Sequence, residues 1–273
     1  MQQVMTCIVS GLGFAIGAAC SYLRLRRRLR WAPAVLRVAV TLALVANVGY
    51  LAGRFRSAGV VQTFQYSFDD AILLAALLGL MGIGTHLART LRGVDGFLFL
   101  VALPAQLGAL SVVHRPEVEN TTGRVWFVSH SIAFAISGTL FIAGGVAGVA
   151  YLLVNWMLRR KRPTTLVGNV ASLESLERFG RWTPVIGFPF FTYGILTGLC
   201  GVWHRPDLKV GAWFLDPVLV SSLLAWAVFG CLCYGSLYKP QIRGKRAAVL
   251  STYGLGLIVV AYLFRVFFSL LHT

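Results

Sequence analysis

Long apolar runs alternate with short polar segments along the whole chain, and eight of the runs are long enough to cross a membrane. A spanning α-helix needs about 20 apolar residues to cross about 30 Å of hydrocarbon. The pattern therefore predicts an all-α fold, a polytopic membrane helix bundle of about eight transmembrane helices. The predicted spans are residues 3–23, 34–53, 71–91, 96–114, 126–158, 184–203, 218–238 and 247–270.

Basic residues indicate how these spans are oriented. Of the 25 Lys and Arg residues, 18 fall in segments assigned to the inside, six in outside segments, and Arg265 within the last span. An excess of basic residues is typical of the cytoplasmic side. The first run begins with the uncharged "MQQVMT" and is followed by "RLRRRLR", the reverse of a secretory signal peptide. We therefore predict an uncleaved first helix and both termini outside.

Composition narrows the class of protein further. The chain is 57% hydrophobic and only 12% charged, which argues against a soluble domain. Its net charge of +16 comes from short bursts between apolar runs rather than from one basic face, so we predict a lipid bilayer and no nucleic acid as partner. The five cysteines fall mostly inside apolar runs, where a thiol behaves as a small hydrophobe.

Polar residues at three other positions have structural explanations. Asp69 and Asp70 precede the third span and are expected to cap its N-terminus. His86 stands alone in an apolar helix, which favours packing or an interhelical hydrogen bond. The segment "NVASLESLERFG", residues 169–180, has the pattern of a short amphipathic helix on the inner membrane surface.

Histidines gather at the predicted outer face. Counting residues from the inner end of each span places His130 about 13 Å and His272 about 10 Å above the hydrocarbon. His114 and His204 end two other spans in "HRPE" and "HRPD", where proline stops the helix and arginine reaches the headgroups, and they are secondary candidates for a site. Histidines at a wet membrane interface are also tolerated without any function.

Aromatic residues accompany these histidines and suggest a ligand. Trp126 lies one turn before His130, and Trp203 and Trp213 flank the neighbouring outside loop. Flat aromatic surfaces beside paired imidazoles suit a planar macrocycle with axial iron ligands, that is, haem. Zinc would also accept histidines, but the acids and cysteines offer no compact ligand spacing.

Arg265 is a charged residue at the edge of the last span. It lies two turns before His272 on the same helix face. It can snorkel outward or pair with Asp216, or it can hold an anionic group such as a haem propionate below the imidazole.

The second half of the chain resembles the haem-handling cytochrome c assembly family. The similar segments are "SLESLERFGRWTPVIGFPFFTYGILTG", at residues 172–198, and then in order "WFLDP", Trp226, "RGKRAAVL" and "LLHT". The resemblance covers about residues 126 to 273. Family members include CcsA-type, CcmC-type and HemX-type proteins, and the length and "SLESLERF" are most similar to the CcsA/HemX-type branch.

This resemblance implies roles for individual residues. His130 matches the first outside haem-ligating histidine and His272 the second, while Trp213 and Asp216 match the tryptophan-rich outside platform; the implied cofactor is haem b. The platform is reduced, because Leu215, Val218 and Leu219 replace the second tryptophan and a Lys-Glu pair of the family pattern. Tyr234 stands where some members carry an inner histidine.

The predicted organisation is one integrated membrane domain, with a four-span region at 1–125 and a haem-handling region at 126–273. The predicted function is haem binding at the outer face in cytochrome c assembly, by an assembly factor rather than a stand-alone enzyme. The alternatives are a HemX-like regulator of haem biosynthesis and a membrane transporter. Expected partners are other cytochrome c maturation proteins or a haem-synthesis enzyme, and the expected location is a bacterial inner membrane.

Overall fold

The computed structural model describes residues 2–27, 29–63, 67–110, 124–160, 170–203, 217–239 and 243–271, which form helices and short connections. The helices are α1 (Gln2–Arg27), α2 (Ala32–Thr63), α3 (Ser67–Leu87), the 3-10 helix η1 (Arg89–Leu91), α4 (Val94–Leu110), α5 (Arg124–Arg159), α6 (Leu173–Trp203), α7 (Pro217–Tyr238) and α8 (Lys245–Leu271). Each predicted span overlaps one of the eight α-helices, although the span 71–91 runs past α3 into η1 and the span 96–114 ends beyond the described residues. The all-α class and the order of elements are confirmed for the described residues. Among those residues, α1, α2, α3, α5, α6 and α7 are long and apolar enough to cross a membrane, and α4 is shorter, at 17 residues.

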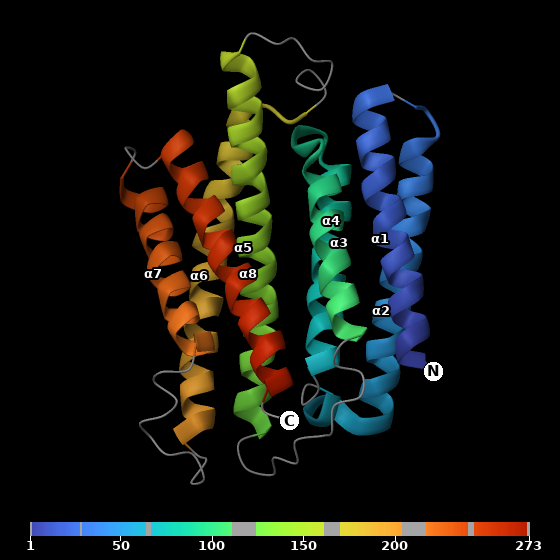
Figure 1. Ribbon diagram of the computed structural model, residues 1–273, viewed down its shortest axis with the longest axis vertical. Coiled ribbons are helices and arrows are strands. Elements are labelled where there is room, and N and C mark those ends of the chain that lie inside the picture. Colours follow the sequence, from blue (N-terminus) through green and yellow to red (C-terminus); the bar gives the residue numbers. More distant parts are fainter. Residues whose placement is uncertain are drawn as a thin grey trace. The chain divides into compact units, whose positions relative to one another are not determined.

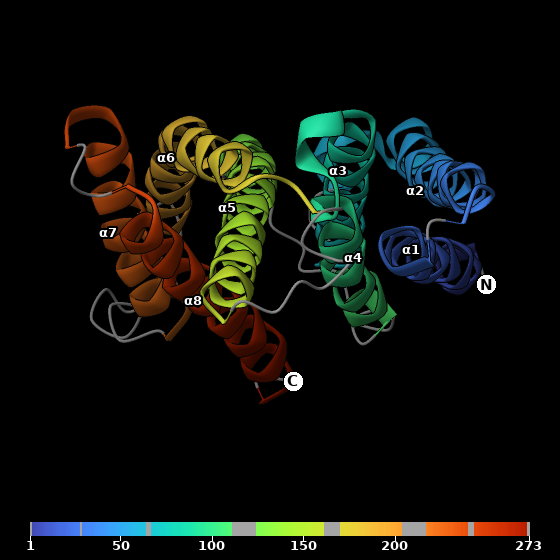
Figure 2. The same cartoon turned by 90° about the horizontal axis from the view of Figure 1, so that it is seen from above.

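The chain divides into two compact units. Unit 1 contains residues 1–119 and 153–176, and unit 2 contains residues 120–152 and 177–273. In unit 1, α1 and α3 each pack against both α2 and α4, so the four helices close into an antiparallel bundle (Figures 1 and 2). Phe14 and Phe99 are fully buried in this bundle.

In unit 2, helices α5 to α8 pack through glycines and aromatic rings. A Cβ atom at Gly148 of α5 would lie 2.8 Å from the carbonyl oxygen of Ala248 in α8, so these backbones touch. Close approach at small residues is typical of helices packed within membranes. The rings of Phe141 in α5 and Phe229 in α7 stack with centroids 3.6 Å apart. Both rings are buried and form the centre of the unit.

The predicted surface helix at residues 169–180 is wrong. The structure instead begins α6 at Leu173 and continues the same helix to Trp203, through Pro184 and Pro189. Leu176 is buried, so the apolar side of the segment packs against protein. The backbone N–H of Ala171 donates to the carbonyl oxygen of Arg92 at 2.9 Å, which ties the start of the segment to the turn before α4.

Replacing Gly13 with alanine is expected to lower the free energy of unfolding by about 1–3 kcal/mol, as overpacking generally does. The new Cβ atom would lie 2.6 Å from the carbonyl oxygen of Ala39, and this α2 backbone cannot move aside cheaply. Denaturant titration in mixed micelles measures the change. Gly49→Ala is the matched control, because nothing lies within 4 Å of a Cβ at that position. Equal stability of the two variants would contradict the packing.

Candidate functional site

Four helix ends point toward the same end of unit 2. The start of α5, the end of α6, the start of α7 and the end of α8 all lie there (Figure 1). Trp126 and His130 belong to the first turns of α5, and Trp203 is the last residue of α6. His272 directly follows α8. The helices therefore bring the segments that carry or border the predicted haem residues to the same end.

The ring of His130 is bonded to the backbone of α6. Its Nδ1 atom lies 2.7 Å from the carbonyl oxygen of Gly194. A carbonyl oxygen can only accept, so Nδ1 must carry the hydrogen and donate it. In the neutral imidazole this leaves the lone pair on Nε2, which is the atom that can bind a metal.

Two glycines of α6 make room for this arrangement. A Cβ atom at Gly198 would lie 2.7 Å from Nδ1 of His130, so the imidazole occupies the space of a side chain. A Cβ at Gly194 would lie 2.5 Å from the ring of Phe134. That ring is the aromatic neighbour of His130, with centroids 4.5 Å apart. The side chain of His130 is therefore held by α6 on one side and by Phe134 on the other.

An open apolar groove of about 410 Å³ runs beside this position, between α5 and α6. Small-molecule sites commonly have volumes of about 300–1,000 Å³. Its lining includes Ser129 and Tyr193, the residues that precede His130 and Gly194. Its lining is Ser129, Ile132, Ala133, Ile136, Pro189, Phe190 and Tyr193.

The sequence analysis missed three residues that hold His130, namely Phe134, Gly194 and Gly198. Gly194 had a signal in the sequence, because glycines at 180, 187 and 194 are seven residues apart and place small residues on one face of α6. Trp126 is 41% exposed, and its carbonyl oxygen accepts a hydrogen bond from Ser129 at 3.0 Å.

Several predicted site residues lie outside the part of the chain that the structure describes. These are His204, Trp213, Asp216 and His272, together with the side chains of Trp203 and Arg265. Leu215 and His114 are also outside it. Their roles stay predictions.

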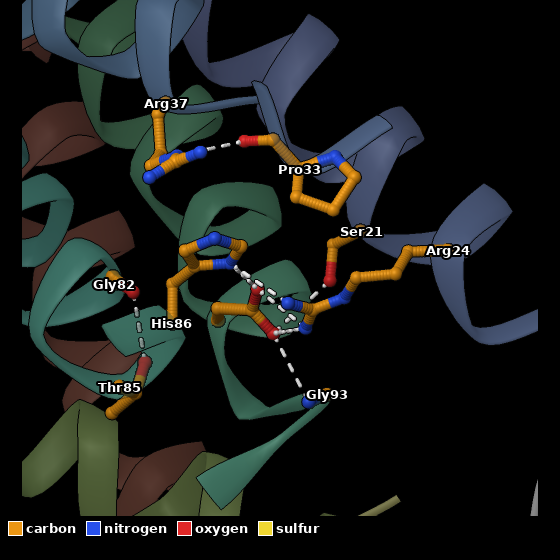
Figure 3. A network of polar contacts seen from close by, with 9 residues as sticks. Ser21, Arg24, Pro33, Arg37, Gly82, Thr85, His86 and Gly93 are labelled. Atoms are coloured by element: carbon orange, nitrogen blue, oxygen red, sulfur yellow. Dashed lines mark hydrogen bonds and ion pairs between the residues drawn. The ribbon is translucent and has the colours of Figure 1, made fainter. Parts of the chain in front are cut away.

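Unit 1 holds a buried polar network around Asp95, at the start of α4 (Figure 3). The side chain of Asp95 is 0% exposed. It accepts hydrogen bonds from Ser21 at 3.0 Å, from Arg24 at 3.0 and 3.2 Å and from the backbone N–H of Gly93 at 3.0 Å. Nδ1 of His86 lies 2.9 Å from the same carboxylate. Four segments of unit 1 are thus joined by a single side chain.

This network confirms one expectation from the sequence. His86 makes an interhelical contact, as its isolated position in an apolar helix predicts. Arg24 lies within α1, which continues past the predicted end of the first span at residue 23, and it pairs with Asp95. A buried charge is unfavourable without a partner of opposite charge, and the guanidinium of Arg24 is that partner for Asp95.

A second polar cluster lies at the start of α3, at the opposite end of that helix from His86. Asp69 stands in the first turn of α3, as predicted, but it does more than cap that helix. Its carboxylate accepts from the hydroxyl of Tyr50 at 2.9 Å and from Arg54 at 3.4 Å. Between the two networks, the amide of Asn47 in α2 donates to Gln106 in α4 at 3.0 Å. Polar pairs therefore join α2 to α3 and to α4.

The outer faces of the helices are apolar. On α2, the side chains of Val38, Leu42 and Val45 are 61%, 58% and 62% exposed. Such a continuous apolar face is unfavourable in water and suits contact with lipid. With six helices in the described part of the chain long enough to span, the fold and its surface define an integral membrane protein, a polytopic helical bundle.

A model of the Cytochrome C assembly protein family matches residues 71–272, which is most of the chain. The chain therefore belongs to the Cytochrome C assembly protein family. The match begins in α3, well before residue 126, where the resemblance was expected to start.

Among curated proteins, the chain is similar to several called "Cytochrome c biogenesis protein CcsA". That of Heterosigma akashiwo is 37% identical over 89 residues, which cover 33% of this chain and 26% of the relative. That of Thermosynechococcus vestitus is 23% identical over 216 residues, 66% of this chain and 65% of the relative. That of Guillardia theta is 25% identical over 153 residues, half of each chain. The matches thus span between 26% and 65% of these relatives' length, and no solved structure matches.

Proposed function

We propose that this protein binds haem b at the outer face of the membrane and handles it during cytochrome c assembly. Family membership and relatives named for cytochrome c biogenesis support the process. The observation that carries the haem proposal is the hydrogen bond from Nδ1 of His130 to the carbonyl of Gly194. Histidines that bind metals usually donate their second ring N–H to such a carbonyl or to a carboxylate.

The proposed site combines His130 with residues of the outer loops and of α8. His130 and His272 would be the axial ligands. Trp213 and Asp216 would form a reduced platform, and Arg265 would hold a propionate. Trp126, Trp203 and His204 would complete the surroundings. When bound, haem supplies an iron centre that takes two nitrogen ligands.

The described part of this site fits that group. The ring orientation at His130 is fixed by α6, and the ligand atom is set by the tautomer. The separate groove between α5 and α6 is apolar, and His130 is not part of its lining. Apolar walls with few polar groups are the usual surroundings of a cofactor. His130 therefore has the donor chemistry that an iron-containing ligand needs.

The proposal includes a topology and a setting. Eight spans with both termini outside would place the His130 end of unit 2 at the outer face, in a bacterial inner membrane. Residues 1–125 would form the four-span region and residues 126–273 the haem-handling region. Other cytochrome c maturation proteins would be the partners, and the protein would be an assembly factor rather than an enzyme.

An imidazole rescue experiment tests the role of His130. The purified His130→Gly variant is expected to lose the absorption of ligated haem and to recover it when imidazole is added, because the small ligand replaces the missing side chain. His86→Gln is the matched control, because it changes a histidine in unit 1 and keeps a donor towards Asp95; it should retain the wild-type spectrum.

The alternatives predict other spectra. Haem absorption that is unchanged in His130→Gly would contradict the assigned ligand. A wild-type protein that binds no haem would contradict the proposed function and favour the HemX-like regulator, with a haem-synthesis enzyme as partner.

A further inference from the structure

The hydroxyl of Thr197 shares an acceptor with His130. Its Oγ1 atom lies 3.0 Å from the carbonyl oxygen of Gly194, the atom that also receives Nδ1–H of His130. Oγ1 also lies 2.9 Å from the carbonyl oxygen of Tyr193. A hydroxyl carries a single hydrogen, so it donates mainly to one of these oxygens at a time. Thr197 is only 3% exposed, so water does not compete for this hydrogen.

Two donors on one carbonyl oxygen weaken each other. When Thr197 donates to Gly194, the carbonyl has less electron density to offer His130. When the hydroxyl of Thr197 donates to the carbonyl of Tyr193 instead, the oxygen of Gly194 accepts only from the imidazole and from the backbone of its own helix. In a site of low dielectric such differences in hydrogen bonding are larger than in water.

We propose that Thr197 is a positioning residue that weakens the His130–Gly194 hydrogen bond and thereby tunes the basicity of Nε2. A weaker bond to Nδ1–H makes the imidazole a weaker electron donor to a metal, which favours the reduced iron. The inferred effect on electron donation from His130 to the iron rests on the proposed function. The competition between the two donors does not.

Thr197, like many threonines in membrane helices, bonds to the preceding turn of its own helix, but one of its acceptors also receives a side chain from another helix. A control threonine should make the same local bond to a carbonyl that no such side chain shares. Thr139 is such a case, because its hydroxyl donates to the carbonyl of Ala135 at 2.7 Å. It is also buried, at 5% exposed. Thr139→Val therefore removes the same kind of bond from α5 without touching the oxygen of Gly194. It is the matched control for Thr197→Val.

Nuclear magnetic resonance of the haem-free protein, labelled at its histidines, tests the competition. The Nδ1–H resonance of His130, identified by its loss in His130→Ala, is expected to move downfield in Thr197→Val because its hydrogen bond becomes stronger. Thr197→Ser keeps the hydroxyl and should restore the wild-type position, and Thr139→Val should not move it. An unchanged resonance in Thr197→Val would overturn the proposal.

Redox titration of the haem-loaded protein tests the consequence. Thr197→Val should shift the midpoint potential to more negative values, and Thr197→Ser should return it towards wild type. If haem binds and the potential of Thr197→Val equals that of Thr139→Val, the tuning role is wrong. If no haem binds to any variant while the resonance still moves, the proposed function fails and the hydrogen-bond competition stands.

Discussion

Asp95→Ala is expected to lower the free energy of unfolding by about 3–5 kcal/mol, the usual effect of removing one partner from a buried ion pair. The carboxylate is fully buried and accepts hydrogen bonds from Ser21, Arg24 and the backbone N–H of Gly93. Nδ1 of His86 also lies 2.9 Å from it. Loss of the carboxylate leaves the guanidinium of Arg24, only 18% exposed, without its counterion. Denaturant titration in mixed micelles, followed by tryptophan fluorescence or circular dichroism, measures the change.

Ser21→Ala distinguishes the loss of one neutral hydrogen-bond donor from the loss of the charged carboxylate itself. It removes only one hydrogen bond to Asp95, so the expected loss is about 1 kcal/mol. The order of stability should be wild type, then Ser21→Ala, then Asp95→Ala. If Asp95→Ala is as stable as Ser21→Ala, the ion pair with Arg24 does not hold these helices together.

Gly198→Ala is expected to weaken haem binding by about 10–100-fold, the range typical of residues that orient a metal ligand. The added methyl group would lie 2.7 Å from Nδ1 and 2.8 Å from Cε1 of His130. The imidazole must therefore turn away, and its bond to Gly194 is lost. Haem titration of the purified protein, followed by absorption, gives the change in affinity.

Gly180→Ala is the matched control for this effect. It makes the same substitution in the same helix, but its Cβ atom meets neighbours only at 3.9 Å or more, in ordinary contact. Its haem affinity should equal that of the wild type. An equal loss of haem affinity in both variants would mean that any alanine substitution in α6 weakens binding. The space that Gly198 leaves for the ring of His130 would then not be the cause.

The sequence predicts the helices well because each apolar run is long and bounded by charges. It fails at residues 169–180, where an amphipathic pattern does not reveal whether the apolar side meets lipid or protein. Leu176 is buried by protein, and α6 runs through Pro184 without ending. Tertiary packing around Leu176, rather than the local sequence pattern, decides that this segment becomes the start of α6.

Pairings across long distances in the chain are beyond what one sequence can predict. Arg24 and Asp95 are 71 positions apart, and each resembles an ordinary loop charge near the end of a span. His130 and Gly194 are 64 positions apart. The sequence did indicate a role for His130, because matched heights with His272 and nearby tryptophans favour haem. The carbonyl that sets its tautomer belongs to α6, and it reaches His130 only through the tertiary packing of α5 against α6.

The central claim is that His130 and His272 hold one haem iron. The most direct test is electron paramagnetic resonance of the oxidised, purified wild-type protein, together with its haem content. We predict one haem per chain with the low-spin ferric signal of two nitrogen ligands, converted to a high-spin signal in His130→Ala and in His272→Ala. A wild-type protein without haem, or a low-spin signal that persists in both variants, would contradict the account.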